Sequence, residues 1–448
     1  MSLYDAMMIG VAGLDANSRA LSISSSNIAN VNTVGYKTSN SAFATMLASA
    51  GGGAGVSDAS VMANAQQNIV QQGLLMSTSS STDLAISGNG FFRVSTTPNL
   101  GGQALYTRAG SFQPDADGNL ENTSGLYLMG WPISGNTGPS TTDPNALQAI
   151  NLSNLAGKGE ATTSISLQQN LQASATADST YNVNDMTNNV VAPDFTRTIN
   201  VYDTQGGSQP VQVSYIKTGA NTWQYEVAYD GSASNITGNG SNGTNVNPIA
   251  TGTLQFDSNG ALVSTTDTTN GANSTSTDGS ANIVIPFNAS SGLQPQTINL
   301  DFGTPGKSDG TSQFDTDSVL TNANVDGAVF GQVTGVKIDS DGTVNANYSN
   351  GLSEAVFKIP LVTFANPDGL SSISGNAFAQ TAQSGTAMIN PAGTGGSGTI
   401  ASNSLEGSTV DLATEFTNMI TTQRAYSASA RVVTTASQML DTLMQMQG

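Results

Sequence analysis

The last forty residues of the chain, from Gly407 to Gly448, constrain its fold more than any other stretch. No glycine or proline interrupts this stretch between Leu412 and Gln447, and apolar, small or polar residues recur at alternating spacings of four and three: Leu412, Phe416, Met419, Gln423, Tyr426, Ala430, Val433, Ser437, Leu440 and Met444. This spacing is typical of one long helix with a single seam. Ser408 and Asp411 stand where the C-terminal seam begins, as in a helix-capping pair. A stripe of this length needs a partner that covers it.

The first residues of the chain repeat the same spacing. The N-terminal seam follows a cap-like Ser2 and Asp5 and contains Leu3, Met7, Gly10, Leu14, Asn17, Leu21, Ser24 and Ile28. Two complementary seams, one at each end, predict an antiparallel pair of terminal helices that resembles a coiled coil. The alternative is that each helix packs on its own globular domain, because the same spacing marks an ordinary core face.

Small and polar positions inside both seams favour packing against copies of the same chain. Polar residues in a seam fix the register and the number of partners at some cost in stability. We therefore predict that the large apolar seam residues pack between subunits. They are Leu3, Met7, Leu14, Leu21 and Ile28 in the N-terminal seam, and Leu412, Phe416, Met419, Tyr426, Val433, Leu440 and Met444 in the C-terminal seam.

Composition excludes several classes of function. The 448 residues leave room for about three domains of ordinary size. Only 10% of the residues are charged, and 12 Lys plus Arg against 31 Asp plus Glu give a net charge of −19. Such a balance argues against nucleic acid or an anionic membrane as a partner. The sequence contains no cysteine and no histidine, which removes disulfides, the usual zinc ligands and the commonest acid–base residue. We therefore predict no enzyme activity, no metal and no cofactor.

Export signals of the ordinary kind are absent from the N-terminal sequence. It lacks a basic region followed by an apolar core, and no segment reaches the ~18 apolar residues of a membrane span. If the protein leaves the cell, a separate apparatus must export it.

The middle of the chain has the pattern of β-structure. Four segments are rich in β-branched and aromatic residues and predict strands: Arg197–Asp203, Val211–Lys217, Trp223–Tyr229 and Ile283–Phe287. Three segments share an Asp-Gly or Asn-Gly step followed by an apolar residue: 115–120, 257–262 and 339–344. They predict tight hairpin turns rather than calcium loops, because none supplies the remaining spaced oxygen ligands.

The region that follows the first helix is predicted to be an elbow, a segment that joins the helix to the body of the chain. Its asparagines compete for backbone hydrogen bonds and end the helix. Phe43, Met46 and Leu47 have helical spacing and predict a short continuation, and the glycine run 51–55 predicts a flexible break.

The elbow also carries a family resemblance. The segment from Ser26 to Lys37 resembles the N-terminal signature of the bacterial flagellar rod, hook and hook-associated axial proteins, through Asn27, Ile28, Ala29, Asn30, Asn32, Thr33, Gly35, Tyr36 and Lys37. The C-terminal run from Val410 to Leu443, with Gln423-Arg424-Ala425-Tyr426 at its centre, looks like the closing signature of the same family. The segment from Thr198 to Trp223 resembles the outer domain of the hook members, which the shorter distal rod members lack.

The resemblance implies a mainly β, α+β fold in which two β-rich domains are inserted between the terminal helices. The implied division is a terminal helical domain (1–36 and 405–448), an elbow (37–82), an inner β-domain (83–156 and 325–404) and an outer β-domain (157–324). It implies a structural subunit that polymerises into a curved, flexible tube and transmits torque from the motor and rod to the filament.

The same resemblance implies partners and a location. The partners would be copies of the chain, the other axial proteins (rod, hook cap and hook-filament junction) and the flagellar type III export apparatus. The location would be the extracellular flagellum, reached without a cleaved signal peptide.

Other functions remain open on the residues alone. A distal rod-type axial protein would share the terminal signatures. A secreted β-rich adhesin would explain the acidic middle rich in Thr and Asn, but not two matched terminal helices. A glycoside hydrolase would need two carboxylates in one cleft, and the sequence nominates no such pair.

Overall fold

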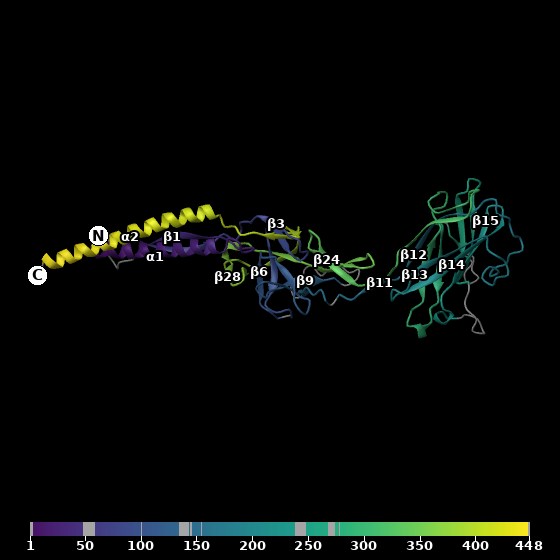
Figure 1. The fold of residues 1–448 in the computed structure, drawn as a ribbon, viewed down its shortest axis with the longest axis horizontal. Coiled ribbons are helices and arrows are strands. Elements are labelled where there is room, and N and C mark those ends of the chain that lie inside the picture. Colours follow the sequence, from purple (N-terminus) through teal and green to yellow (C-terminus); the bar gives the residue numbers. More distant parts are fainter. Residues whose placement is uncertain are drawn as a thin grey trace. The chain divides into compact units, whose positions relative to one another are not determined.

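The computed structural model of the chain describes residues 3–47, 59–99, 101–133, 143, 146–153, 155–237, 248–267, 274–276 and 278–446. It is mainly β, with one long helix at each end, as the sequence predicts (Figure 1). The chain divides into two compact units. The first unit contains 1–155, 335–347 and 353–448, and the second contains 156–334 and 348–352. The predicted glycine break at 51–55 lies outside the described residues.

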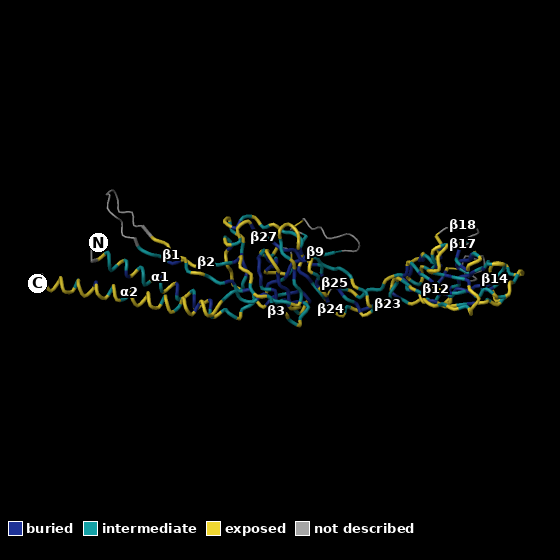
Figure 2. The backbone as a smooth tube through the Cα atoms, turned by 90° about the horizontal axis from the view of Figure 1, so that it is seen from above, coloured by how far each residue is buried: buried dark blue, intermediate teal, exposed yellow. Residues whose placement is uncertain are grey.

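The terminal helices α1 (Leu3–Ala29) and α2 (Leu412–Met446) lie side by side and run in opposite directions (Figures 1 and 2). Near the chain ends they approach closely: a Cβ on Gly10 would lie 2.8 Å from Cγ2 of Val433. At the other end, Asn27 contacts Glu415. Asp411 caps α2, because its Oδ1 accepts from the backbone N–H of Ala413 at 2.8 Å. Neither helix is both long and apolar enough to cross a membrane, within the residues described.

The elbow region is a β-hairpin that contacts α1. Strands β1 (Ser39–Leu47) and β2 (Ala59–Gln67) pair antiparallel along their whole length, from Ser39 opposite Gln67 to Leu47 opposite Ala59. The predicted helical continuation at Phe43, Met46 and Leu47 is therefore wrong. Over so short a run, spacing cannot separate helix from strand, and pairing with β2 decides the outcome. Strand β3 (Leu75–Ser77) then pairs with β32 (Ser404–Glu406) just before the C-terminal helix.

A 13-stranded sheet fills the rest of the first unit. Its main path has the order β24-β25-β26-β9-β5-β6-β29-β28, formed by Val333–Ile338, Thr343–Tyr348, Ser353–Lys358, Tyr127–Pro132, Phe91–Ser95, Ala104–Thr107, Ala377–Ala379 and Ser371–Ile373. Five further strands join it: β7 (Phe112–Pro114), β8 (Leu120–Asn122), β10 (Gln148–Ala149), β27 (Pro360–Thr363) and β30 (Met388–Pro391). Strands β4 (Leu84–Ser87) and β31 (Thr399–Ser402) pair separately, and 3₁₀ helix η5 spans Pro367–Gly369. The core includes fully buried Phe92, Phe112 and Leu361.

The second unit packs two sheets around one core. The first has the order β13 to β18: Phe195–Tyr202, Ser208–Gly219, Thr222–Tyr229, Ala250–Phe256, Leu262–Asp267 and Ser274–Ser276. The other contains β12 (Ser164–Asn170), β19 (Ser280–Ile285), β20 (Gln296–Asp301), β21 (Thr311–Ser312) and β22 (Val319–Val325). Strands β11 (Lys158–Glu160) and β23 (Ala328–Gly331) form a separate ribbon, and 3₁₀ helices η2 and η4 span Ala233–Asn235 and Ala289–Ser291. Trp223, Tyr215 and Tyr225 are fully buried between the sheets.

The local predictions for the middle of the chain are confirmed. The four predicted strands fall in β13, β14, β15 and β19, with boundaries that differ by up to three residues. The three predicted turns connect consecutive strands, and each places its glycine at positive φ: 86° at Gly118, 81° at Gly260 and 86° at Gly342. The first aspartate organises each of two turns: Oδ1 of Asp115 accepts from Asn119 N at 2.8 Å, and Oδ1 of Asp257 accepts from Ala261 N at 2.8 Å.

A buried carboxylate organises one loop of the second unit. Glu226 on β15 is 1% exposed and accepts hydrogen bonds from Tyr181 OH at 2.7 Å and Asn184 N at 2.8 Å. The backbone N–H of Thr187, at 2.7 Å, and its hydroxyl bind the other oxygen of the carboxylate. Burial and the bond to Glu226 raise the pKa of Tyr181, so its phenol stays a donor. One side chain therefore holds the loop from Tyr181 to Thr187.

We predict that Glu226→Ala destabilises the second unit by about 3 kcal/mol, because several donors lose their acceptor in a buried site. Urea unfolding followed by tryptophan fluorescence measures the loss, and chymotrypsin should newly cleave after Tyr181. Glu160→Ala, which removes an exposed carboxylate of the same unit, is the control. Equal stability of the two variants would contradict the prediction.

Candidate functional site at the junction of the two chain termini

The residues of the N-terminal signature gather where both ends of the chain meet the sheet of the first unit. We call this region the terminal junction and define it by Asn27, the segment 34–38, Arg108 and the segment 406–415. Here the chain leaves α1, and β32 leads into α2. The junction therefore lies between the end of α1 and the beginning of α2.

Three buried charges form the centre of the terminal junction. Nζ of Lys37 lies 2.6 Å from Oε1 of Glu406, and both side chains are fully buried. Nη1 of Arg108 lies 3.4 Å from Oε2 of the same carboxylate, and the Arg108 side chain is 3% exposed. Removing charges from water is costly unless they are paired and hydrogen-bonded. This ion triad is therefore stable only when all three segments are in place.

Backbone groups satisfy much of the remaining hydrogen-bonding capacity of the ion triad. Lys37 donates to the carbonyl of Gln71 at 2.5 Å, and Gly73 N donates to Oε1 of Glu406 at 2.7 Å. Nη2 of Arg108 donates to the carbonyl of Gly88 at 2.9 Å. Burial lowers the pKa of Lys37, and the carboxylate of Glu406 opposes that shift.

A second polar network joins the end of α1 to the start of α2. The amide of Asn27 donates to Oε1 of Glu415 and to the carbonyl of Ser39, both at 2.8 Å. Its Oδ1 accepts from Ser39 N and from Tyr36 OH, both at 3.1 Å. Asn27 and Glu415 are 1% and 4% exposed. Burial, with the nearby Glu415 carboxylate, raises the pKa of Tyr36.

Gly35 lets the N-terminal segment pass close to the sheet. Its φ is +69°, and a Cβ at this position would lie 2.7 Å from the backbone nitrogen of Ala109. Its N–H donates to the carbonyl of Glu406 at 2.8 Å. Only glycine combines this backbone conformation with such an approach at low cost.

The other signature residues play local roles. The amide of Asn30 donates to the carbonyl of Ser26 at 2.8 Å, and Thr33 Oγ1 donates to Oδ1 of Asn30 at 3.1 Å, which closes the end of α1. Ala29 and Asn32 are exposed, and Ile28 is half-buried.

The predicted seam residues of α1 are only partly buried in the structure. Met7, Leu14, Leu21 and Ile28 are half-buried, and the side chain of Leu3 lies outside the described residues. The buried positions are small or polar instead: Gly10, Ala16, Ala20, Ser24 and Asn27. Small side chains allow the close approach of α2, and the β1–β2 hairpin also contacts α1.

The predicted seam of α2 coincides only in part with the stripe that faces α1. Met419, Val433 and Leu440 are half-buried, but Leu412, Phe416, Tyr426 and Met444 are 40–74% exposed. The covered stripe adds positions that the apolar pattern did not indicate: Glu415, Thr422, Ser429 and Ala436. Figure 2 shows α2 as largely exposed along its length.

Sequence reasoning missed three residues of the terminal junction: Arg108, Glu406 and Glu415. Glu406 pairs with partners 369 and 298 residues away along the chain, so no local spacing marks it. The low content of charged residues could have pointed to them, because only 10% of the chain is charged and each charged residue is therefore a candidate for a specific role.

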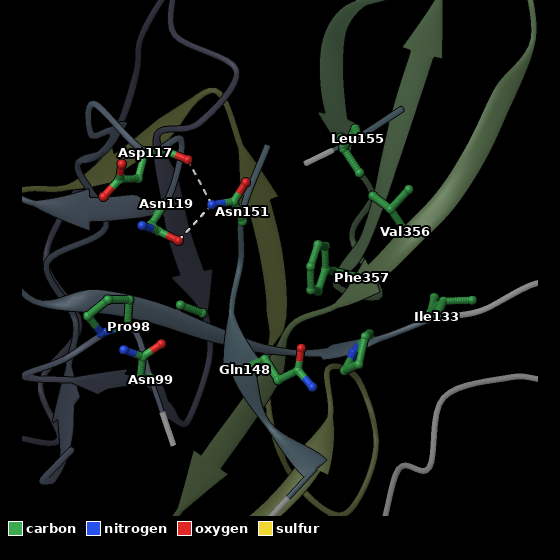
Figure 3. Close-up of a pocket in the computed structure, with 12 residues that line it drawn as sticks. Pro98, Asn99, Asp117, Asn119, Ile133, Gln148, Asn151, Leu155, Val356 and Phe357 are labelled. Atoms are coloured by element: carbon green, nitrogen blue, oxygen red, sulfur yellow. Dashed lines mark hydrogen bonds between the residues drawn. The ribbon is translucent and has the colours of Figure 1, made fainter. Parts of the chain in front are cut away.

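The described residues contain no group of three side chains that could hold a metal ion. A cavity of about 680 Å³ in the first unit is lined by polar and apolar residues, including Asp117, Asn119 and Phe357 (Figure 3). Three of its polar residues bind one another: the amide of Asn151 donates to the carbonyl of Asp117 at 2.8 Å and to Oδ1 of Asn119 at 2.9 Å (Figure 3).

Family models match segments at both ends of the chain and in both units. The chain matches the flagella basal body rod protein family over residues 7–37 and the FlgE/F/G D1 domain of flagellar hook protein over residues 85–175. It also matches the flagellar basal body protein FlaE D2 domain over residues 170–328 and the C-terminal domain of flagellar basal body rod FlgEFG protein over residues 401–446. These matches place the chain among the rod and hook proteins of the bacterial flagellum.

Relatives that match almost the whole chain show which family within the rod and hook proteins it belongs to. Flagellar hook protein FlgE of Rhizobium meliloti is 35% identical over 449 residues, with 100% of both chains covered. The FlgE proteins of Caulobacter vibrioides (31% over 597 residues, 99% of each chain) and Escherichia coli (33% over 438 residues, 97% of this chain and 98% of the other) are also similar. The chain therefore belongs to the flagellar hook protein FlgE family, and the predicted resemblance is confirmed.

We predict that Lys37→Met destabilises the first unit by about 3 kcal/mol, because Glu406 stays buried with a weaker set of partners. Thermal unfolding measures the loss, and limited proteolysis should release α1 and α2 earlier than in the native protein. Lys337→Met is the matched control, because the ion pair of Lys337 with Asp339 is largely exposed and such pairs contribute roughly 0–1 kcal/mol. Equal losses in the two variants would refute the prediction.

Proposed function

We propose that this chain is a structural, non-enzymatic subunit that assembles with copies of itself into the flagellar hook, a curved tube that transmits torque from the rod to the filament. The observation that carries the proposal is the exposed apolar surface of the terminal helices. Among the described residues, Tyr4, Met8 and Val11 of α1 and Phe416, Ile420 and Met444 of α2 are 46–74% exposed. Large apolar side chains gathered on an exposed surface mark an interaction site.

The exposed apolar residues of α2 lie on two flanks. At 3.6 residues per turn, Leu412, Phe416 and Ile420 share one flank, while Val432, Met439 and Leu443 share the other. The stripe toward α1 lies between them, and Arg424 and Arg431 lie opposite it. Two apolar flanks fit a helix that has a neighbouring subunit on each side.

This arrangement supports the coiled-coil-like arm inferred from the two seams. The predicted seam residues that contact α1 would hold the pair together, and the exposed ones, such as Phe416 and Tyr426, would pack between subunits. We propose that the subunit is divided, as predicted, into terminal helices (1–36 and 405–448), elbow (37–82), inner β-domain (83–156 and 325–404) and inserted outer β-domain (157–324).

Partners and location follow from the family. The relatives are flagellar hook proteins, so we propose self-assembly and an extracellular position in the flagellum. The rod, the hook cap and the hook-filament junction would be neighbours along the axis, and the flagellar export apparatus would deliver the chain without a cleaved signal. The match of residues 170–328 to the D2 domain favours a hook subunit over a distal rod subunit.

We predict that Ile420→Asp abolishes tube formation, because the aspartate would be buried without a partner at every contact between subunits. Ile420 is 52% exposed in the single chain, so the fold of each unit should not change. Electron microscopy of concentrated protein measures assembly, and circular dichroism measures the fold. Thr435→Asp, at an exposed position on the polar face of α2 that carries Arg431, should still assemble. Normal tubes from Ile420→Asp would contradict the proposed packing.

We also predict that a chain joining Leu155 directly to Gly335 still forms tubes, but straight ones. The deletion removes almost all of the second unit and leaves the terminal helices and the sheet of the first unit. In the proposed function, the tube has several subunit arrangements of nearly equal free energy. Contacts of the second unit stabilise some of these arrangements over others and so set the curvature. Electron microscopy decides the matter: tubes with native curvature would show that bending is encoded in the first unit.

A further inference from the structure

A small cavity in the first unit lies next to the ion triad. Its volume is about 350 Å³, within the range of small-molecule sites, roughly 300–1,000 Å³. Phe91 and Phe364 line it, with their ring centroids 6.0 Å apart in an edge-to-face arrangement. Val70 and Met388, both about half exposed, also line it. The cavity is thus shaped by aromatic and aliphatic surface.

Two polar atoms of residues that line this cavity are buried without a hydrogen bond among the described residues. They are Nε of Arg108 and Oγ1 of Thr363. Arg108 is only 2% exposed, and its other two nitrogens bind Glu406 and Gly88. Buried donors normally have acceptors, so a missing acceptor marks a place where a ligand oxygen would be stabilised. Among the described residues that line the larger cavity of Figure 3, none has a buried side-chain nitrogen or oxygen without a hydrogen bond.

The charge balance beside the cavity favours an anion. Lys37 and Arg108 supply two positive charges, and Glu406 supplies one negative charge. The carboxylate of Asp368, whose neighbour Pro367 lines the cavity, is exposed and accepts from Ile69 N at 3.1 Å. A buried region with one excess positive charge is stabilised by a bound carboxylate.

We propose that this cavity binds a small aromatic carboxylate. The ring would lie against Phe91 and Phe364, where edge-to-face contacts are available. The carboxylate would accept from Nε of Arg108 and from the hydroxyl of Thr363. The guanidinium of Arg108 already lies 5.4 Å from the centroid of the Phe91 ring, so the charged and aromatic parts of the site are adjacent.

The test uses the full chain and 3-phenylpropionate as the probe, with 3-phenylpropanol as its neutral counterpart. Isothermal titration calorimetry and saturation-transfer NMR should show saturable binding of the carboxylate at one site. The alcohol should bind at least about tenfold more weakly, because it has no negative charge to pair with the guanidinium of Arg108. Thr363→Val should weaken carboxylate binding about fivefold through the loss of one hydrogen bond.

A cavity-filling variant separates this site from nonspecific binding without changing the ion triad. Val70→Trp should abolish binding, and Val263→Trp, the same substitution at an exposed position of the second unit, should leave it unchanged. Thermal unfolding checks that both variants fold. The proposal is overturned if no saturable binding occurs, if the alcohol binds as well as the carboxylate, or if Val70→Trp binds like the native chain.

Discussion

The carboxylate of Glu406 is the point on which the arrangement of the first unit depends. It is fully buried on β32, and it binds Lys37 from the segment after α1 and Arg108 from the end of β6. A buried carboxylate without partners is strongly destabilising, so β32 reaches its place only together with both cations. Because α2 begins six residues later and α1 ends eight residues before Lys37, the same contact determines where both helices connect to the sheet.

The distribution of charge separates two kinds of contact. Inside the terminal junction, charged and amide groups have specific partners at fixed distances, as between Asn27 and Glu415. On the outer flanks of α2, the exposed side chains include large apolar ones, and in the proposed assembly they would contact neighbouring subunits without directional partners. Hydrophobic contacts depend mainly on the area removed from water, so neighbouring subunits can shift slightly without losing all of it. Directional contacts inside the chain and non-directional contacts outside it suit a subunit that must stay intact while its surroundings change.

Local features of this fold could be predicted from the sequence, and long-range ones could not. The two helices, the strands such as Trp223–Tyr229 and the turns at Gly118, Gly260 and Gly342 follow from spacing and backbone preference. The hairpin at Phe43 was missed because pairing with β2 overrides a short helical pattern. The signature residues Asn27, Gly35 and Lys37 were found through family resemblance, but their partners Glu415, Ala109 and Glu406 lie far away along the chain. The spacing of neighbouring residues does not show which distant residue pairs with a buried charge.

A purely apolar junction would pack as well, and often more stably, than an ion triad. It would not, however, require that the three segments dock together. An apolar contact tolerates partial docking, because each covered side chain contributes on its own. The ion triad does not, because removing Lys37 or Arg108 takes a hydrogen-bonded partner from a carboxylate that water does not reach. In a chain with only 12 cationic residues, two of them are buried at this one place. The ion triad therefore couples the docking of both terminal segments to the sheet, which an apolar contact of the same size would not do.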